Sequence, residues 1–429
     1  ETLGWNFRNN WEAAVDSFGS IWQSDNDDDG NRGVRINFVM EYGNYGYRDE
    51  FTGKGWRDKR SNIEKEIPDR HWHLNDPGVV PNLILTGAGS PTGIIIYEGN
   101  LFPNLINQVI HCDAGPNVCR AYPRKNNGAG YDAEMMPILS GGKDRWYRPS
   151  DVAVGPDGSL FIADWYDPGV GGHGMRDLDR GRIFRVVPEA HNGYKFTKRD
   201  FKSLEGAISG LLSSDLESRY LGWNALHEMG VEKTQDALIK LISDKDKIKR
   251  ARAAWCLGKM PGAGKMVIDK ISKDLDSDLR IVAIRLARQL NSDVVNLITM
   301  LSNDKSPQVR RECAIALREL DVKEVPKLWA KLALQHDGKD RWYLEALGIA
   351  AEGKWDECFK AWIGSGGQWN TKAGKDIVWR SRSKMAPELL VKIVKDPGTN
   401  EEEKPKYMRA FDFHSGPEKE LALQSLLLE

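Results

Sequence analysis

The sequence predicts an all-β segment followed by an all-α solenoid. From residue 1 to about 188, short apolar stretches alternate with clusters of Gly, Asp, Asn and Pro, which is typical of strands joined by turns. In the second half, a similar phrase recurs at intervals of 31, 30, 30 and 31 residues around Arg219, Arg250, Arg280, Arg310 and Arg341. A repeat of this length is typical of stacked two-helix units. We therefore expect two domains, over residues 1–190 and 198–429.

Bulk composition excludes several classes of function. The chain has 429 residues, enough for two or three domains, and a formal net charge of −1. A chain this close to neutral has no whole-molecule field that selects nucleic acid or an anionic membrane. No apolar run reaches about 18 residues, so we expect no transmembrane segment. The first residues do not resemble a signal peptide, and we expect the chain to begin inside a domain.

The five cysteines limit the redox chemistry. Cys256 and Cys313 fall at small-residue positions of the helical repeat and are expected to be buried thiols. Cys112 and Cys119 bracket a turn, and a disulfide across a hairpin and two unpaired thiols are equally compatible with this spacing. No Cys-x-x-Cys pair occurs, which excludes covalent haem and cysteine-type zinc sites.

The β segment is predicted to be built from hairpins. Its apolar stretches include "GSIWQSD", "VRINFVM", "TGIIIYEG", "NQVIHCD", "NVCRAYP", "DGSLFIADW" and "GRIFRVVP". Residues 152–165 are typical of a strand, a Pro-Asp-Gly turn and a second strand, and residues 13–27 have the same shape. Hairpins repeated at such intervals favour a β-propeller.

The β segment is too short for a complete propeller. Six blades need roughly 300 residues or more, at about 40–50 residues per blade, so residues 1–190 account for about three. We therefore expect the C-terminal blades of a six-bladed type of propeller. Because bare sheet edges are unlikely to stay uncovered, we expect the missing blades from upstream sequence or from another chain.

The helical half shows a repeated core pattern. Small residues recur where helices must approach closely, and leucines follow them at the shared core: Ala254, Ala283, Ala314, Ala346, Leu257, Leu286, Leu317 and Leu347. Asp278, Asp304 and Asp337 lie near the expected helix starts, where an Asp caps free N–H groups. The phrase resembles HEAT repeats, and Arg380 and Arg409 mark two further candidate units.

The repeated Asp and Arg residues are expected to form a structural ladder between neighbouring repeats rather than a ligand site. The array is expected to present one curved face to a protein partner or to another domain of the same polypeptide.

Several motifs of the β segment resemble those of the glucose/sorbosone dehydrogenase propellers, which are pyrroloquinoline-quinone (PQQ) sugar dehydrogenases. The matches are the Arg8-Asn9 pair, the acidic run at 25–29, the "GNYGY" phrase at 43–47, "GSPTGIIIYEGNLFP" and "YRPSDVAVGPDGSLFIADW". With the solenoid behind it, the chain is most similar to the large propeller–HEAT proteins of Planctomycetes, Verrucomicrobia and Bacteroidetes. Those proteins are described as membrane-bound dehydrogenases and commonly carry a C-terminal cytochrome c domain.

The resemblance implies a cofactor site. Arg8, Asn9 and Arg148 match family positions that contact PQQ or substrate, and guanidinium groups suit a cofactor with three carboxylates. The alternative is that both arginines tie blade edges.

The acidic run itself points to a metal. Asp25, Asp27 and Asp29 are spaced i, i+2, i+4 before Gly30, which suits Ca²⁺, and Glu41 is a candidate for a distant carboxylate ligand. A solvated acidic turn is the alternative. Ile36 stands at position twelve of an EF-hand count, so the run is not an EF-hand.

The chain departs from the family pattern at three points. The family's catalytic histidine lies on an early blade, and no residue here inherits that role. A lysine after the penultimate strand is replaced by "CDAGPN", and Ser150 stands where the family has a second arginine. The match to the family's PQQ-binding pattern is therefore incomplete.

Other polar residues follow strands, where propellers keep their sites. His111 and Asp113 end one strand, and Asp164, Trp165, Asp167 and His173 follow another. Asp113, Asp164 and His173 are therefore candidates for a general base pair or a metal site. Strand caps and turn formers are the alternative interpretation. The 15 tryptophans are compatible with a carbohydrate-stacking groove or with burial between blades.

Two functions remain open at this point. The first is a PQQ-dependent sugar or alcohol dehydrogenase that passes electrons to a cytochrome c domain or protein and is incomplete and inactive as this chain alone. The second is a non-catalytic scaffold of the cell envelope that binds glycans or proteins. The resemblance implies a periplasmic or extracellular location in either case.

Overall fold

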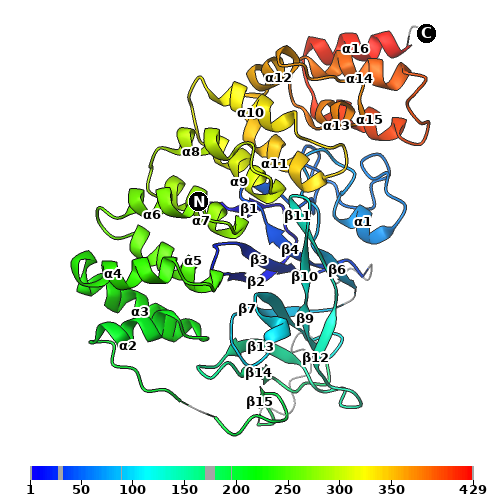
Figure 1. The fold of residues 1–429 in the computed structure, drawn as a ribbon. Helices are drawn as coiled ribbons and strands as arrows, with labels where there is room; N and C mark the ends of the chain where they lie inside the picture. Colours follow the sequence, from blue (N-terminus) through cyan, green and yellow to red (C-terminus); the bar gives the residue numbers. More distant parts are fainter. Residues whose placement is uncertain (1, 28–31, 88, 170–178, 195, 428–429) are drawn as a thin grey trace.

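The computed structural model describes residues 2–27, 32–87, 89–169, 179–194 and 196–427. It confirms the predicted fold class, because antiparallel sheets come first and an α-solenoid follows (Figure 1). Within the described ranges, no helix combines the length and the apolar character that crossing a bilayer requires.

Three antiparallel sheets form the β part. The first has the order β2 (Asn10–Val15), β3 (Ile21–Asp25), β4 (Val34–Val39) and β6 (Ile84–Gly87). The second has the order β7 (Pro91–Tyr97), β8 (Gln108–Asp113), β9 (Val118–Tyr122) and β12 (Met136–Ser140). The third has the order β13 (Pro149–Val154), β14 (Leu160–Asp164) and β15 (Arg182–Val186).

Smaller elements decorate these sheets. They are the parallel pair β1 (Gly4–Trp5) and β5 (Gly43–Asn44), the hairpin β10 (Arg124–Asn127) and β11 (Gly130–Ala133), helix α1 (Ile67–His71) and the 3₁₀ turn η1 (Pro103–Leu105). The apolar stretches read from the sequence correspond to β3, β4, β7, β8, β9, β14 and β15.

The first strands of the three sheets, β2, β7 and β13, lie side by side and run in the same direction. Glu12 accepts a hydrogen bond from the Ile94 amide, and five residues further on the Ser17 amide donates to Glu98. Thr92 Oγ1 donates to the Pro149 carbonyl oxygen at 2.8 Å. Adjacent, parallel first strands, each followed by an antiparallel meander, are the blade arrangement of a propeller.

Apolar side chains fill both spaces between neighbouring sheets. Trp22 and Phe38 of the first sheet each pack against Tyr131 of the β10–β11 hairpin, with ring centroids 5.2 Å apart, and Cys112 and Ile162 belong to one apolar cluster shared by the second and third sheets. Cys112 and Cys119 face each other across β8 and β9, and both are buried free thiols. This structure therefore has the second of the two arrangements that the sequence left open, two unpaired thiols.

Helices from residue 204 onward form the solenoid. They are α2 (Leu204–Leu211), α3 (Leu216–Met229), α4 (Val231–Ile242), α5 (Lys247–Gly258), α6 (Gly264–Ile271), α7 (Ser277–Gln289), α8 (Val294–Leu301), α9 (Pro307–Leu317), α10 (Val325–Ala333), α11 (Arg341–Ala351), α12 (Trp355–Gly364), α13 (Lys372–Arg380), α14 (Ala386–Lys395), α15 (Lys404–Ala410), η2 (Phe411–Phe413) and α16 (Pro417–Leu427).

The repeat positions behave as the sequence predicts. The recurring alanines and leucines are all fully buried. Arg280 binds Asp304 of the next repeat through two hydrogen bonds of 2.6 and 2.8 Å, and Arg250 donates one hydrogen bond of 3.2 Å to Asp274. The caps differ from the expectation: Asp276 caps α7 and Asp340 caps α11. Asp278 pairs with Lys247 instead, and Asp304 pairs with Arg280.

The solenoid lies along the β part as an arc from α2 to α16 (Figure 1). Its arginines reach across to backbone oxygens of the β part. Arg285 donates to the Phe18 carbonyl at 3.0 Å, and Arg341 donates to the Asp76 and Val79 carbonyls. The curved face predicted from the repeat is therefore covered, at least in part, by a domain of the same polypeptide.

Candidate functional site

The starts of β2, β7 and β13 come together at one end of the sheets, which we call the mouth. Arg8 and Asn9 precede β2, Ser90 precedes β7 and Arg148 precedes β13. The second strand of each sheet ends at the same place. The structure thus brings Arg8, Asn9 and Arg148 to one end of the β part, although they lie on different sheets.

One aspartate ends the second strand of each sheet and plays the same part in all three. Each carboxylate accepts a hydrogen bond from a backbone N–H just before the first strand: Asp25 from Asn9 at 2.8 Å, Asp113 from Ser90 at 2.7 Å, and Asp164 from Arg148 at 2.7 Å. An arginine of the third strand lies beside each carboxylate: Arg35 at 2.7 Å, Arg120 at 3.7 Å and Arg182 at 2.6 Å. These aspartates brace the mouth of each blade.

The sequence carried a signal for this brace that its interpretation missed. The three strands end in "QSD", "HCD" and "IAD", so a small residue precedes the aspartate each time. The sequence predicts a metal role for Asp25 and catalytic roles for Asp113 and Asp164, whereas the structure gives all three the same position in their sheets. The catalytic roles of Asp113 and Asp164 stay predictions, and His173 lies outside the described residues.

Asp113 differs from the other two braces in its electrostatics. Burial raises the pKa of Asp113 to about 6, and the amide of Ser90 and the guanidinium of Arg120 offset this only in part. Its Oδ2 has no hydrogen-bond partner within the described part of the chain. Neighbouring His111 is also fully buried, and burial together with Arg120 lowers the pKa of its imidazole to about 3. His111 is therefore neutral at neutral pH.

Replacing Asp113 by Asn should change how stability depends on pH. An unfolded Asp titrates near 4, whereas folded Asp113 titrates near 6, so the folded chain holds this proton more tightly. The wild-type carboxyl therefore costs stability as the pH rises from about 4 through about 6. Relative to wild type, Asp113→Asn should gain about 1–3 kcal/mol of unfolding free energy between about pH 4 and pH 8. Urea denaturation at both pH values measures the unfolding free energy, and Asp269→Asn, at an exposed carboxylate, is the control. The prediction is refuted if the difference from wild type is the same at both pH values for Asp113→Asn, as it should be for Asp269→Asn.

The guanidinium of Arg148 is occupied by backbone oxygens. Its nitrogens donate to the carbonyls of Asp167 at 3.1 Å, Ala114 at 2.9 Å, Gly115 at 3.3 Å and Pro168 at 3.2 Å. These carbonyls belong to loops that follow β8 and β14. In this structure Arg148 connects the second blade to the third. This agrees with the alternative interpretation of the sequence, in which the arginine ties blade edges.

The proposed calcium ligands do not converge among the described residues. Asp25 is fully buried against Arg35, and Glu41 binds Arg288 of α7, away from the mouth. Asp27 accepts the Gly33 amide at 2.7 Å and lies 3.3 Å from His71 Nε2. Asp29 lies outside the described residues. Within the described ranges, no group of three His, Cys, Asp or Glu side chains could hold a metal ion, and the calcium site stays a prediction.

A basic and aromatic pocket of about 530 Å³ lies beside Arg8. It is lined by Tyr47, Arg48, Lys54, Gly55, Trp56, Arg57 and Asp58. The guanidinium carbons of Arg8 and Arg48 lie 5.9 and 4.6 Å from the centre of the Tyr47 ring, and that of Arg57 lies 5.0 Å from Trp56. Three cations line the pocket and Arg8 lies beside it, whereas the single lining carboxylate, Asp58, is paired with Lys54 at 2.9 Å. The remaining guanidinium groups and the aromatic rings favour an anion with a flat face.

This pocket was missed from the sequence, although "GYRDEFTGKGWRDKR" at 46–60 interleaves aromatic and basic residues. It joins the acidic turn through His71, whose ring centroid lies 5.8 Å from that of Tyr47 and 6.3 Å from that of Trp56. Arg8, Asp27, His71 and the pocket therefore form one continuous region.

Comparison with known proteins gives limited matches. A family model described as a domain of unknown function (DUF7133) matches residues 2–190. No curated protein sequence matches the chain.

Solved structures of sugar dehydrogenases are similar at low identity. A putative oxidoreductase (glucose dehydrogenase) of Thermus thermophilus is 18% identical with a TM-score of 0.31, covering 43% of this chain and 47% of that one. The apo soluble aldose sugar dehydrogenase of Escherichia coli is 18% identical, with a TM-score of 0.31 and coverages of 44% and 47%. The PQQ-bound aldose sugar dehydrogenase of Streptomyces coelicolor is 17% identical, with a TM-score of 0.29 and coverages of 43% and 45%. This chain spans about half the length of these structures.

Proposed function

We propose that residues 1–190 are the C-terminal part of a quinoprotein sugar or alcohol dehydrogenase propeller, and that they supply the anion-binding side of its cofactor site. The observation that supports this most directly is the basic, aromatic pocket beside Arg8. PQQ is planar and carries three carboxylates, which matches aromatic rings and guanidinium groups in one place. Arg8, Arg48 and Arg57 would hold the carboxylates, and bound PQQ would supply the oxidation of the substrate.

The residues fit PQQ at one side of the mouth only. The guanidinium of Arg148 is occupied by four carbonyls, so we assign no cofactor contact to it. Asp25 and Glu41 are paired with arginines and do not fit a calcium ion, and we derive no step that depends on calcium. Of the acidic run, the structure also describes Asp27, which accepts a hydrogen bond from the Gly33 amide.

Other blades would have to complete the site. β2 is an innermost strand, yet Trp11 and Val15 on it are 66% and 56% exposed. In a closed propeller the blades surround a central channel, and each blade packs face to face with its neighbours. In β2, residues on both faces of the strand are exposed. We therefore propose that blades from upstream sequence or from another chain cover β2 and carry the catalytic base, in a protein of the periplasm or cell envelope that passes electrons to a cytochrome c partner.

A non-catalytic scaffold is the second candidate. The observation that favours it is the use of Asp25, Asp164 and Arg148 as braces, which leaves fewer groups for chemistry at the mouth. In that case the solenoid, which we propose to be of the HEAT type, would serve assembly rather than electron transfer.

Titration with PQQ separates the two candidates. We expect the wild-type chain to bind PQQ saturably, because several cations flank the aromatic pocket. Arg57→Gln should weaken binding by about tenfold, since a charge-assisted hydrogen bond contributes roughly 1.5–3 kcal/mol. Quenching of tryptophan fluorescence by the quinone measures the affinity, with and without Ca²⁺. Dye reduction with sugars should be absent for this chain alone.

Arg60→Gln is the matched control, because Arg60 is a highly exposed arginine that pairs with Asp412 away from the pocket. This variant should bind PQQ as the wild type does. Absence of saturable binding, or equal weakening in Arg57→Gln and Arg60→Gln, would favour the scaffold.

A further inference from the structure

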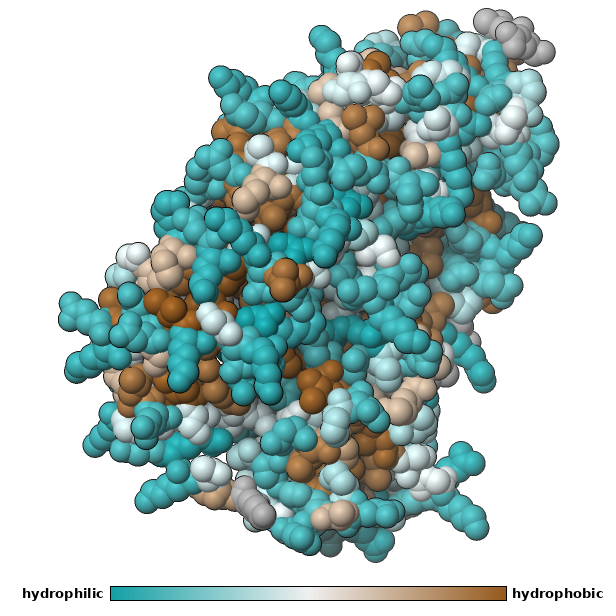
Figure 2. Space-filling view, viewed as in Figure 1, coloured by the Kyte–Doolittle hydropathy of each residue, from teal (hydrophilic) through white to brown (hydrophobic). Residues whose placement is uncertain are grey.

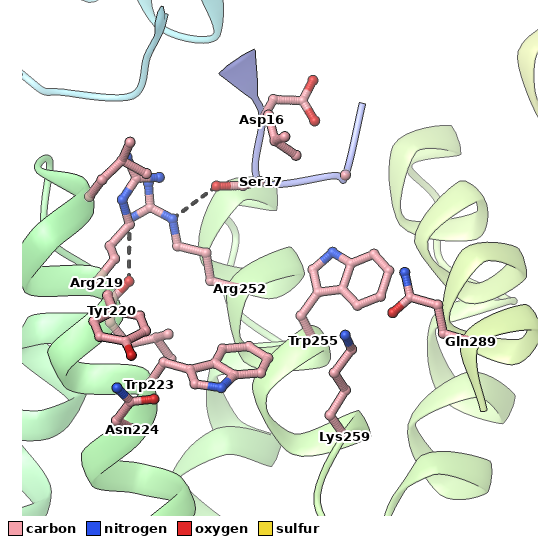
Figure 3. Close-up of a pocket in the computed structure, with 14 residues that line it drawn as sticks. Asp16, Ser17, Arg219, Tyr220, Trp223, Asn224, Arg252, Trp255, Lys259 and Gln289 are labelled. Carbon is pink, nitrogen blue, oxygen red and sulfur yellow. Dashed lines mark hydrogen bonds between the residues drawn. The ribbon is translucent and has the colours of Figure 1, made fainter. Parts of the chain in front are cut away.

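A second pocket, of about 520 Å³, lies where the β2–β3 turn meets helices α3 and α5 (Figure 3). Its volume is in the range of small-molecule sites. The side chains that matter for the argument are Tyr220, Trp223, Asn224, Trp255, Lys259 and Gln289. The pocket adjoins Val15 to Ser17, at the end of β2, whereas the mouth is at its start. Six strand residues, about 20 Å, separate the two sites.

The charged groups at the back of this pocket are already paired. Arg252 donates to Glu98 at 3.0 Å and to Ser17 Oγ at 2.9 Å, and Arg219 binds the same carboxylate. Asp16 accepts the amides of Phe18 and Ser20. These groups form a rigid, satisfied wall and are not the ones that would bind a ligand.

The polar groups nearer the opening have no such partners. Lys259 Nζ lies 5.6 Å from the Trp255 ring centroid, and within the described residues it has no carboxylate partner. The side-chain amides of Asn224 and Gln289, and the indole N–H groups of Trp223 and Trp255, make no hydrogen bond to another described residue. In Figure 3 the Trp223 and Trp255 rings lie near each other, with Lys259 beside Trp255 and with Asn224 and Gln289 at opposite edges of the pocket.

The surface around the pocket is apolar and exposed. Leu216, Tyr220 and Leu221 of α3 are 59%, 67% and 49% exposed. Figure 2 shows apolar side chains gathered over α3 and α5. Monomeric proteins rarely expose such gathered apolar groups without a binding role.

We infer that this pocket binds a saccharide that carries a carboxylate group. Indole rings pack against the C–H faces of a sugar, because they offer a large flat apolar surface with a polar edge. The amides of Asn224 and Gln289 can pair with hydroxyl groups, and the ammonium of Lys259 with the carboxylate. A purely apolar ligand would bury Lys259 and the two amides without partners, which costs free energy.

The inference is independent of the proposed function, because it uses none of the mouth residues. Calorimetric titration with trigalacturonate tests it, with the fully methyl-esterified trimer as the uncharged probe of the same shape. The wild-type chain should bind both probes saturably and the charged trimer more tightly. Lys259→Gln should weaken the charged trimer by about tenfold and leave the ester unchanged. Because Lys259 is exposed, this substitution is not expected to disturb folding.

Trp223→Ala should weaken both probes, because it removes one of the indole faces. Trp11→Ala is its matched control, since Trp11 is an exposed indole on β2 outside the pocket. Circular dichroism establishes whether each variant is folded. If Trp223→Ala is unfolded, the comparison of Lys259→Gln with wild type tests the inference. No saturable heat with either probe, equal affinity of wild type for both probes, or equal weakening in Trp11→Ala and Trp223→Ala would overturn the inference.

Discussion

Glu98→Ala is expected to lower the free energy of unfolding by about 3–5 kcal/mol, among the largest effects that a single substitution should have on this protein. Glu98 follows β7 and is 8% exposed. Its carboxylate accepts the Ser17 amide at 2.9 Å and the Ser17 hydroxyl at 2.8 Å, and it also binds Arg219 and Arg252 of the solenoid. Removing it leaves two largely buried guanidinium groups without a counter-charge, at the junction of the two parts.

The pKa of Glu98 is consistent with this role. Burial alone would raise the pKa of this carboxyl, but Arg252, Arg219 and Ser17 outweigh burial and hold it below its usual value. The stabilisation that the Glu98 carboxylate provides is therefore present above the unfolded pKa, near 4.3, and is lost as the pH falls through the lower folded pKa. The difference in unfolding free energy between wild type and Glu98→Ala should thus be largest at neutral pH and should shrink in acid.

Urea denaturation followed by circular dichroism measures the effect. Glu388→Ala is the control, because Glu388 forms an exposed i, i+4 pair with Lys392 on α14, and such pairs contribute about 0.3–0.5 kcal/mol. Similar losses for the two variants would show that the Glu98 cluster does not hold the β part to the solenoid.

Asp25→Ala is expected to cost about 3–5 kcal/mol as well, with or without added Ca²⁺. Asp25 and Arg35 are both fully buried, and Arg35 also stacks 3.5 Å from the centre of the Trp72 ring. The carboxylate further holds the amides of Arg8 and Asn9. Its removal leaves a buried cation and two backbone donors unpaired, which no ion in solution would repair.

Thermal unfolding in EDTA and in millimolar Ca²⁺ distinguishes the brace from a metal ligand. Asp269→Ala, which removes an exposed carboxylate on α6, should leave the melting temperature nearly unchanged in both buffers. If Asp25→Ala were as stable as wild type in EDTA and lost only a calcium-dependent gain, Asp25 would be a calcium ligand and the brace would be refuted.

Local patterns in the sequence were sufficient for the fold class. The hairpins at 13–27 and 152–165 were predictable because Gly19 and Gly158 take the positive φ values, +80° and +85°, that their turns require. The solenoid was predictable because alanines and leucines recur at the period of a helix pair. Both signals depend on residues close together in the chain, so no tertiary information is needed to read them.

The mouth could be predicted only in part. The resemblance placed Arg8, Asn9 and Arg148 together, and the structure brings them to one end of the sheets. It could not predict that the four carbonyls around Arg148 would occupy its guanidinium, since those carbonyls become neighbours only when two blades pack. For the same reason the equivalence of Asp25, Asp113 and Asp164 was hidden: each binds an amide 16 to 23 residues away.

Hydrophobic periodicity and turn chemistry act over a few residues, so the positions of strands, turns and repeated helices are predictable from the sequence. The role of each charged side chain depends on how distant segments pack. Glu98 meets Arg252 across 154 positions and Asp76 meets Arg409 across 333. Whether a carboxylate braces a strand, pairs with an arginine or remains open to a ligand depends on burial and on partners that packing alone brings within hydrogen-bond distance.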